Sequence, residues 1–196
     1  MTMTKYDIKT IVNIKYLTVH HTGGVEDNKY ASTQHHTAED INTWHKLRWP
    51  DFKSELGWYG GYNFFIDKNG LVTQFRRVGE ETAANKGHNL DAVSICLAGN
   101  FTKMVDEPTE QQTVKLKELL TYFYKSGIIK WENIIPHRAL QYTECYGNGL
   151  SDTWARDLII EERKKDVSRI IQELSDIIAR LILLINKKKF GGHDRG

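Results

Sequence analysis

The chain has 196 residues, of which 40% are hydrophobic and 27% are charged, and its formal net charge is +2. This length fits one domain with a sizeable core and room for one additional element. The small net charge excludes the strong basic balance of many nucleic-acid-binding proteins, so we expect no nucleic-acid partner. The only cysteines, Cys96 and Cys145, are too few for a disulfide framework and favour a reducing compartment with free or metal-bound thiols.

The sequence pattern predicts neither a targeting signal nor a membrane span. The first 21 residues have scattered charges and no continuous apolar stretch, so we expect no signal peptide and synthesis in the cytoplasm. The longest apolar run is LILLI at 181–185, whereas a membrane-spanning helix needs about 20 apolar residues.

Residues 14–20 have the alternating pattern of a β-strand. This pattern places Leu17 and Val19 on one face of the strand and Thr18 and His20 on the other. One face of this strand is therefore apolar and the other is polar.

Three further segments have strand patterns. Residues 62–77 predict a hairpin, because two β-rich runs flank Asn69-Gly70, which provides the positive φ of a tight turn. The apolar run at 92–101 is typical of a buried strand, and 134–136 is a short apolar segment before His137.

Two segments in this part of the chain predict helices. Residues 37–48 start with Thr37 as an N-cap followed by acidic residues, and residues 108–127 carry an apolar stripe that ends before Gly127. Helices that alternate with strands predict an α/β fold with a mixed central β-sheet flanked by helices.

The C-terminal part of the sequence has a different pattern. It is helical from about residue 151 to 189, and apolar residues then recur with 4-3-4-3-4 spacing at Val167, Ile171, Leu174, Ile178, Leu181 and Ile185. We therefore expect an extra C-terminal amphipathic helix over 159–190, after a domain at 1–158 and before a tail at 191–196. The apolar stripe of this helix requires a partner: a second copy in a homo-oligomer, the domain itself, or a membrane surface.

Three side chains along the domain have the chemistry of zinc ligands. His20 lies near the end of the first strand, and His137 and Cys145 follow a later one. Zinc favours imidazole nitrogen and thiolate sulfur, and a catalytic zinc keeps three protein ligands and a water. The His137–Cys145 spacing is not a zinc-finger spacing, so the spacing alone favours a surface histidine and an idle thiol over a metal site.

Several motifs, in sequence order, resemble the type 2 N-acetylmuramoyl-L-alanine amidases. This superfamily includes phage lysozyme-like amidases, bacterial recycling amidases and peptidoglycan recognition proteins. The motifs lie mostly within 14–155 and read YLTVHHT (16–22), INTWHKLR (41–48), GWYGGYNFFIDKNGLV (57–72), NLDAVSICLAGNF (89–101) and IPHRALQYTEC (135–145).

The resemblance implies a role for particular residues. It implies that His20, His137 and Cys145 bind Zn²⁺, with His21 as a less favoured alternative to His20. It implies that Tyr62 is a catalytic tyrosine and that Thr143 contacts the reacting carbonyl, at a position where the family usually has lysine or threonine. Cys96 is expected to be a small core residue.

Substrate contacts are expected from Trp58, His88 and Asn89, on the loops around the cleft. The sequence departs from phage-type members here, because Ala84 stands where those proteins often have a histidine, and His88 is displaced by four positions. For Trp58 an equally simple interpretation is core packing.

The function that the resemblance implies is zinc-dependent hydrolysis of the amide between N-acetylmuramic acid and L-alanine in peptidoglycan. We expect a phage endolysin that is made in the host cytoplasm and released by a holin. Two alternatives remain: a cytoplasmic recycling amidase that acts on soluble muropeptides, and a non-catalytic module that binds peptidoglycan.

Overall fold

The computed structural model describes residues 5–190; the predicted tail at 191–196 lies outside them. The chain divides into two compact units, Met1–Ile159 and Ile160–Gly196. The first unit carries all the strands of the described residues, and the second is a single helix over its described part.

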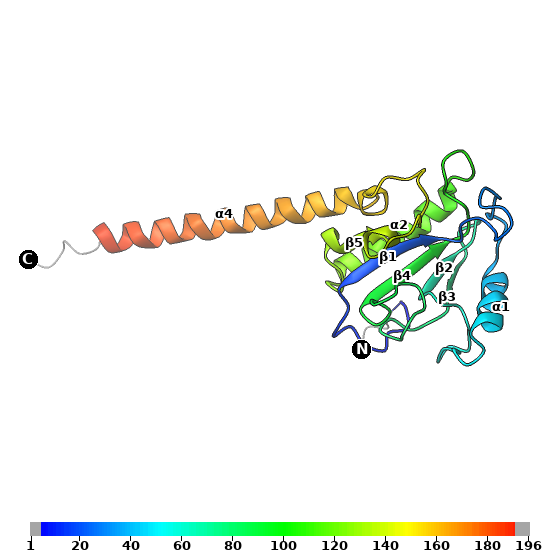
Figure 1. The fold of residues 1–196 in the computed structure, drawn as a ribbon. Coiled ribbons are helices and arrows are strands. Elements are labelled where there is room, and N and C mark those ends of the chain that lie inside the picture. Colours follow the sequence, from blue (N-terminus) through cyan, green and yellow to red (C-terminus); the bar gives the residue numbers. More distant parts are fainter. Residues whose placement is uncertain (1–4, 191–196) are drawn as a thin grey trace, which may run out of the picture. The chain divides into compact units, whose positions relative to one another are not determined.

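The first unit is built on a five-stranded sheet with the order β3-β2-β4-β1-β5 (Figure 1). The strands are β1 (Tyr16–His21), β2 (Phe64–Ile66), β3 (Val72–Gln74), β4 (Ala92–Leu97) and β5 (Ile134–Pro136). Strand β3 is antiparallel to β2, and the other pairings are parallel. This arrangement confirms the mixed sheet expected from the sequence.

The hairpin prediction is also confirmed. Strands β2 and β3 are joined through Asn69 and Gly70, and Gly70 has φ 81°. The carboxylate of Asp67 accepts the backbone N–H groups of Asn69 and Leu71, which closes the turn. A residue with a Cβ at Gly70 would be strained in this conformation.

The two central strands present one apolar and one polar face. In β1, Leu17 and Val19 belong to the main core, whereas Thr18 and His20 point to the opposite side, as the alternation predicts. His20 is paired with Cys96 of β4 in the sheet register. All six residues of β4 are buried, which agrees with the expected buried strand.

Helix α2 (Glu110–Lys125) covers the apolar face of the sheet (Figure 1). Its buried residues include Leu116, Leu119, Leu120 and Phe123, the apolar stripe expected from the sequence. The buried side chain of Gln112 closes a capping box with Thr109 and also donates to the carbonyls of Ile66 and Ala98. The start of α2 is thereby tied to the ends of β2 and β4.

Helix α1 (Ala38–Arg48) packs near the opposite, polar face of the sheet. Ala38 and Ile41 form a second, smaller cluster with Phe65, Phe75, Cys96 and Ala98. Thr37 is the N-cap, as expected. The candidate site lies on this side of the sheet.

Helix α4 (Ile160–Phe190) forms the described part of the second unit. The helical pattern predicted from residue 151 onward is not continuous, because a separate short helix, α3 (Trp154–Asp157), precedes it. The break has a physical reason: Ala155 and Ile159 are buried in the core of the first unit. Within the described residues, no helix has both the length and the apolar character needed to cross a membrane.

Candidate metal centre and cleft

Three potential metal ligands come together on the polar side of the sheet. His20 is the second-last residue of β1. His137 directly follows β5, as the first residue of the short 3-10 helix η2 (His137–Ala139), and Cys145 lies on the loop after η2. One ligand atom from each residue lies within 4.8 Å of the others. The imidazole rings of His20 and His137 have their centroids 4.4 Å apart.

Polar neighbours orient the His20 ring. Its Nε2 is 3.0 Å from the hydroxyl oxygen of Thr18, two residues earlier on the same face of β1. The side-chain amide of Asn85 donates to this same oxygen and to the hydroxyl of Ser94. When His20 Nε2 carries the proton, it can donate to the Thr18 hydroxyl oxygen. The Nδ1 atom of His20 then has its lone pair available, and it lies 3.7 Å from Cys145 Sγ.

Arg138 holds the loop that carries Cys145. Its backbone N–H donates to the Cys145 carbonyl, and its guanidinium donates to the carbonyls of Gly147 and Leu150 and to the carboxylate of Asp152. Arg138, which directly follows the candidate ligand His137, therefore holds the backbone around Cys145.

Burial determines the protonation of these groups. It lowers the pKa of His20 well below the usual value, with a further contribution from His137, and it also lowers the pKa of His137. Burial raises the pKa of the Cys145 thiol to about 12. Both imidazoles are therefore neutral at neutral pH, and the thiol keeps its proton unless a cation replaces it. Nε2 of His137 lies 2.5 Å from the side-chain amide nitrogen of Gln141, so a metal ion bound through this nitrogen would displace that contact.

The donor set fits a zinc ion. Zn–N and Zn–S bonds of about 2.05 and 2.3 Å at a tetrahedral angle place the nitrogen and sulfur about 3.6 Å apart. The separation between His20 Nδ1 and Cys145 Sγ is 3.7 Å. Neutral imidazoles beside a thiol that a metal can deprotonate are the ligands that Zn²⁺ prefers.

Tyr62 lies beside this cluster. Its ring centroid is 5.3 Å from that of His20, and its hydroxyl is adjacent to the Cys96 thiol. Burial raises the pKa of Tyr62 well above its usual value, and the two cysteines raise it further. The hydroxyl therefore keeps its proton and can act as a hydrogen-bond donor at neutral pH.

His45 reaches the same place from helix α1. Its Nδ1 accepts the backbone N–H of Gly61 at 2.9 Å, and its ring centroid is 5.7 Å from that of Tyr62. Burial, together with Arg48 and Arg76, lowers the pKa of His45 to about 4. From the sequence we expect a structural or surface histidine here; only the position of α1 on the sheet reveals that it lines the cleft.

The ligands and Tyr62 line a cleft of about 660 Å³, a usual size for a small-molecule or peptide site. Thr143 lines it too, and its hydroxyl oxygen accepts the Cys145 backbone N–H at 3.3 Å, so its own proton is free for another acceptor. Basic side chains contribute a further part of the wall: Lys29, Arg48 and Lys86.

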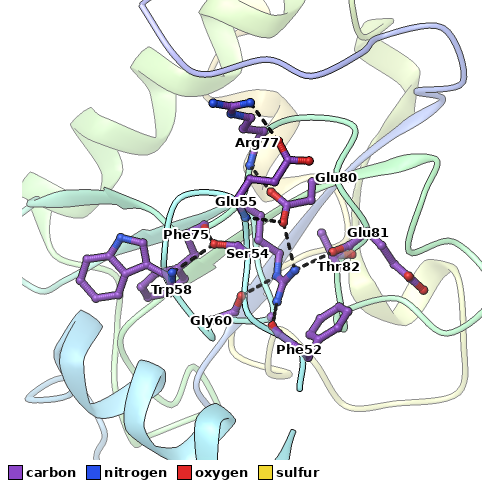
Figure 2. A network of polar contacts seen from close by, with 12 residues as sticks. Phe52, Ser54, Glu55, Trp58, Gly60, Phe75, Arg77, Glu80, Glu81 and Thr82 are labelled. Atoms are coloured by element: carbon purple, nitrogen blue, oxygen red, sulfur yellow. Dashed lines mark hydrogen bonds and ion pairs between the residues drawn. The ribbon is translucent and has the colours of Figure 1, made fainter. Parts of the chain in front are cut away.

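A buried arginine organises the segments that lead into the cleft. Arg76 is 2% exposed, and its guanidinium donates to the carbonyls of Gly60, Glu81 and Phe52. Figure 2 shows these three segments converging, with Glu80 nearby. Gly60 comes two residues before Tyr62, and the segment after Glu81 supplies Ala83 and Ala84 to the cleft wall.

Gly60 itself requires the absence of a side chain. A Cβ at this position would lie 2.2 Å from the Phe75 ring. Phe75 also packs against Trp58, with ring centroids 5.3 Å apart and the ring planes tilted by 54°. The backbone before Tyr62 is therefore held between an aromatic ring on one side and the Arg76 guanidinium on the other.

The three residues expected to contact substrate are placed differently from one another. Asn89 lines the cleft, and its side-chain oxygen accepts the Asn85 backbone N–H. Trp58 packs against Phe75, and His88 is bonded to Asp91 and contacts the Tyr16 ring. Neither Trp58 nor His88 is among the residues that line the cleft, so this geometry gives their substrate contact no support.

Two residues next to the candidate ligands, His21 and Cys96, lie outside the metal-ligand cluster. The metal-ligand cluster contains His20 rather than His21, whose Nδ1 accepts the Phe101 backbone N–H, as expected for the less favoured histidine. Cys96 is completely buried, as expected, but its thiol lies beside the Tyr62 hydroxyl rather than among apolar groups alone.

The sheet with its flanking helices and the His–His–Cys cluster define the class of proteins that share the amidase and peptidoglycan recognition protein fold. The chain belongs to the N-acetylmuramoyl-L-alanine amidase family, whose sequence model matches residues 11–148. This match includes all three candidate ligands, Tyr62 and Thr143. No curated protein sequence matches the chain significantly.

Solved structures agree with the family. The endolysin N-acetylmuramoyl-L-alanine amidase LysCS from Clostridium intestinale is 25% identical with a TM-score of 0.59, over 82% of this chain and 93% of the other. Bumblebee peptidoglycan recognition protein SA is 26% identical with a TM-score of 0.54, over 75% and 86% of the two chains. The endolysin of Thermus scotoductus phage Ph2119, at 19% identity and a TM-score of 0.56 over 78% and 88%, shares the fold.

Proposed function

We propose that the chain is a zinc-dependent amidase that hydrolyses the bond between the lactyl group of N-acetylmuramic acid and L-alanine of the peptidoglycan stem. The observation that carries the proposal is the meeting of His20, His137 and Cys145 beside Tyr62 in one cleft, in a member of the amidase family. A zinc ion held by these three ligands supplies a water of lowered pKa and a Lewis acid for the amide carbonyl.

The residues of the chain supply the remaining interactions. The protonated hydroxyl of Tyr62 donates a hydrogen bond to the oxygen on which charge develops, or orients the attacking water. The hydroxyl of Thr143, whose oxygen is already bonded to the Cys145 N–H, has its proton available for the carbonyl. The lysine that many relatives have at this position would add a positive charge, whereas Thr143 adds only a dipole.

The basic wall of the cleft suits the same substrate. The basic residues Lys29, Arg48 and Lys86 line the cleft, and stem peptides of peptidoglycan carry carboxylates. We assign these side chains, together with Asn89 of the same cleft lining, to contacts with the substrate.

The test is metal analysis of the purified chain, combined with digestion of purified sacculi. We expect about one zinc per chain, release of stem peptides from muramic acid, loss of this release with a chelator, and recovery with added zinc. Cys145→Ala should abolish zinc binding and hydrolysis, whereas Cys96→Ala should retain zinc because its thiol is outside the ligand cluster. A chain without zinc that binds sacculi but releases nothing would be the non-catalytic module instead.

We further propose that the biological role is that of a phage endolysin, made in the host cytoplasm and released to the wall by a holin. The likeness to amidases of the endolysin type supports this role. An endolysin degrades intact sacculi, whereas a recycling amidase prefers soluble muropeptides. Comparison of initial rates on the two substrates therefore separates these roles, and preference for the soluble fragments would contradict the endolysin.

A further inference from the structure

Helix α4 presents an apolar stripe that has no partner within the described part of its own unit. The stripe consists of nine side chains, each between 44% and 62% exposed: Val167, Ile170, Ile171, Leu174, Ile177, Ile178, Leu181, Leu184 and Ile185. A helix of 31 residues with such a stripe gains most of its stability from packing against another surface.

The residue types along the stripe indicate another helix of the same kind. In a heptad labelled abcdefg, the core position a is isoleucine at Ile171, Ile178 and Ile185. The core position d is occupied by Val167, Leu174 and Leu181. Isoleucine at position a combined with leucine at position d favours parallel two-stranded coiled coils.

The polar side of the helix distinguishes a second helix from a lipid surface. Along the stripe itself, between Asp166 and Asn186, there are three carboxylates and two guanidinium groups, a net charge of −1. The whole helix has eight basic and five acidic residues, and its lysines lie near its two ends, at 164–165 and 187–189. Arg169 is engaged within the helix, 3.9 Å from Asp166 and 3.7 Å from Glu173. Helices that lie on membranes have lysine- and arginine-rich polar faces that attract anionic lipids, and this segment has no such excess.

We propose that α4 is a self-association surface, which pairs in parallel with α4 of a second copy of this chain through the apolar stripe. The paired chains carry two catalytic units on one particle. A repeating polymer can engage both units at once, so pairing increases the residence of the protein on the cell wall without any change in the cleft. This last consequence rests on the proposed function, whereas the pairing itself does not.

The test begins with the mass of the full-length chain in solution, measured by light scattering and sedimentation at micromolar concentrations. We expect twice the chain mass of 22.7 kDa. The double variant Ile171→Lys with Ile178→Lys places charges in the stripe and should give the single-chain mass. The matched control, Gln172→Lys with Ala179→Lys, adds the same two lysines to the opposite side of the helix and should remain paired.

The second measurement concerns the polymer. The unpaired variant should bind sacculi at least about tenfold more weakly than the control, with equal hydrolysis of a soluble muropeptide, which also shows that its catalytic unit is folded. A single-chain mass for the wild-type protein overturns the proposal, whether or not the protein then binds vesicles of mixed neutral and anionic phospholipid. Paired chains that hydrolyse nothing would leave the pairing intact and overturn the proposed function alone.

Discussion

At the scale of single residues, Arg76 contributes to the cleft without lining it. Its side chain is almost completely buried and donates hydrogen bonds to carbonyls on three separate segments. Its Cζ atom lies 3.7 Å from the centroid of the Phe52 ring. Arg76→Met would fill much of the same space but leave Glu80 and the carbonyls of Gly60 and Glu81 without their donor. We expect a loss of about 3–5 kcal/mol in the free energy of unfolding, measured by urea denaturation.

The same variant should affect turnover more than metal content. The segment before Tyr62 loses the hydrogen bond between the Gly60 carbonyl and the Arg76 guanidinium, so kcat should fall. Zinc stoichiometry should stay unchanged, since none of the three ligands contacts Arg76. Arg77→Met is the matched control: Arg77 is partly exposed, with an ion pair to Glu55 at 2.9 Å, and its loss should cost less than about 1 kcal/mol. Equal losses in the two variants would contradict the role of Arg76.

His45 gives the protein a pH dependence of its own. Its folded pKa of about 4 lies below the usual 6.5, because of burial and then of Arg48 and Arg76. Between pH 4 and pH 6.5 the unfolded chain binds more protons at His45 than the folded chain does. His45 therefore has no effect on the free energy of unfolding above pH 6.5, and it lowers this free energy as the pH falls toward 4. The largest slope from one such group is about 1.4 kcal/mol per pH unit.

The measurement compares His45→Gln with the wild type at pH 5 and pH 7, in the presence of a chelator so that metal loss does not contribute. Glutamine keeps an acceptor for the Gly61 N–H but cannot be protonated in this range. The variant should therefore lose less stability on acidification than the wild type. Identical losses would mean that His45 titrates alike in the folded and unfolded chains.

At the scale of elements, the polar face of the sheet is covered by a short helix whose start is well defined. The Thr37 hydroxyl accepts the backbone N–H of Asp40 at 3.2 Å, and the Asp40 carboxylate accepts that of Thr37 at 2.8 Å. This reciprocal pair fixes the first turn of α1, the helix that brings His45 to Gly61.

Thr37→Ala should therefore lower the stability of the protein by about 1 kcal/mol, or about 2–4 °C in Tm. Thr43→Ala, the same replacement at an exposed position inside α1, removes no cap and substitutes a better helix former, so Tm should stay level or rise slightly. Calorimetry of both variants makes the comparison, and a larger loss at Thr43 would show that the cap does not stabilise α1.

At the scale of the whole molecule, local patterns were sufficient for most elements. Alternation predicted the two faces of β1, Asn69-Gly70 predicted the hairpin, and Thr37 predicted the start of α1, because each depends on residues close in sequence. The strand order could not be predicted this way: it depends on contacts between segments far apart, such as β1 between β4 and β5. The candidate ligands were assigned through family resemblance rather than spacing.

The features that the sequence did not reveal depend on tertiary position. Nothing near His45 or Arg76 in the sequence indicates that one lines the cleft and the other supports two of its walls. Trp58 and His88 illustrate the converse: Trp58 lies in a motif of the family and His88 directly precedes one, yet they contact Phe75 and Asp91 and are not among the residues that line the cleft. Loop side chains can turn either way with little change in local pattern.

The His–His–Cys cluster has a consequence for the synthesis of the protein. His20 and Cys145, whose ring nitrogen and sulfur face each other, are 125 residues apart, so translation supplies the first ligand early and the last one late. A chain that stops between His137 and Cys145 offers only the two imidazoles, although all five strands of the sheet precede this point. A metal ion that requires all three ligands can therefore be bound only after translation has passed Cys145.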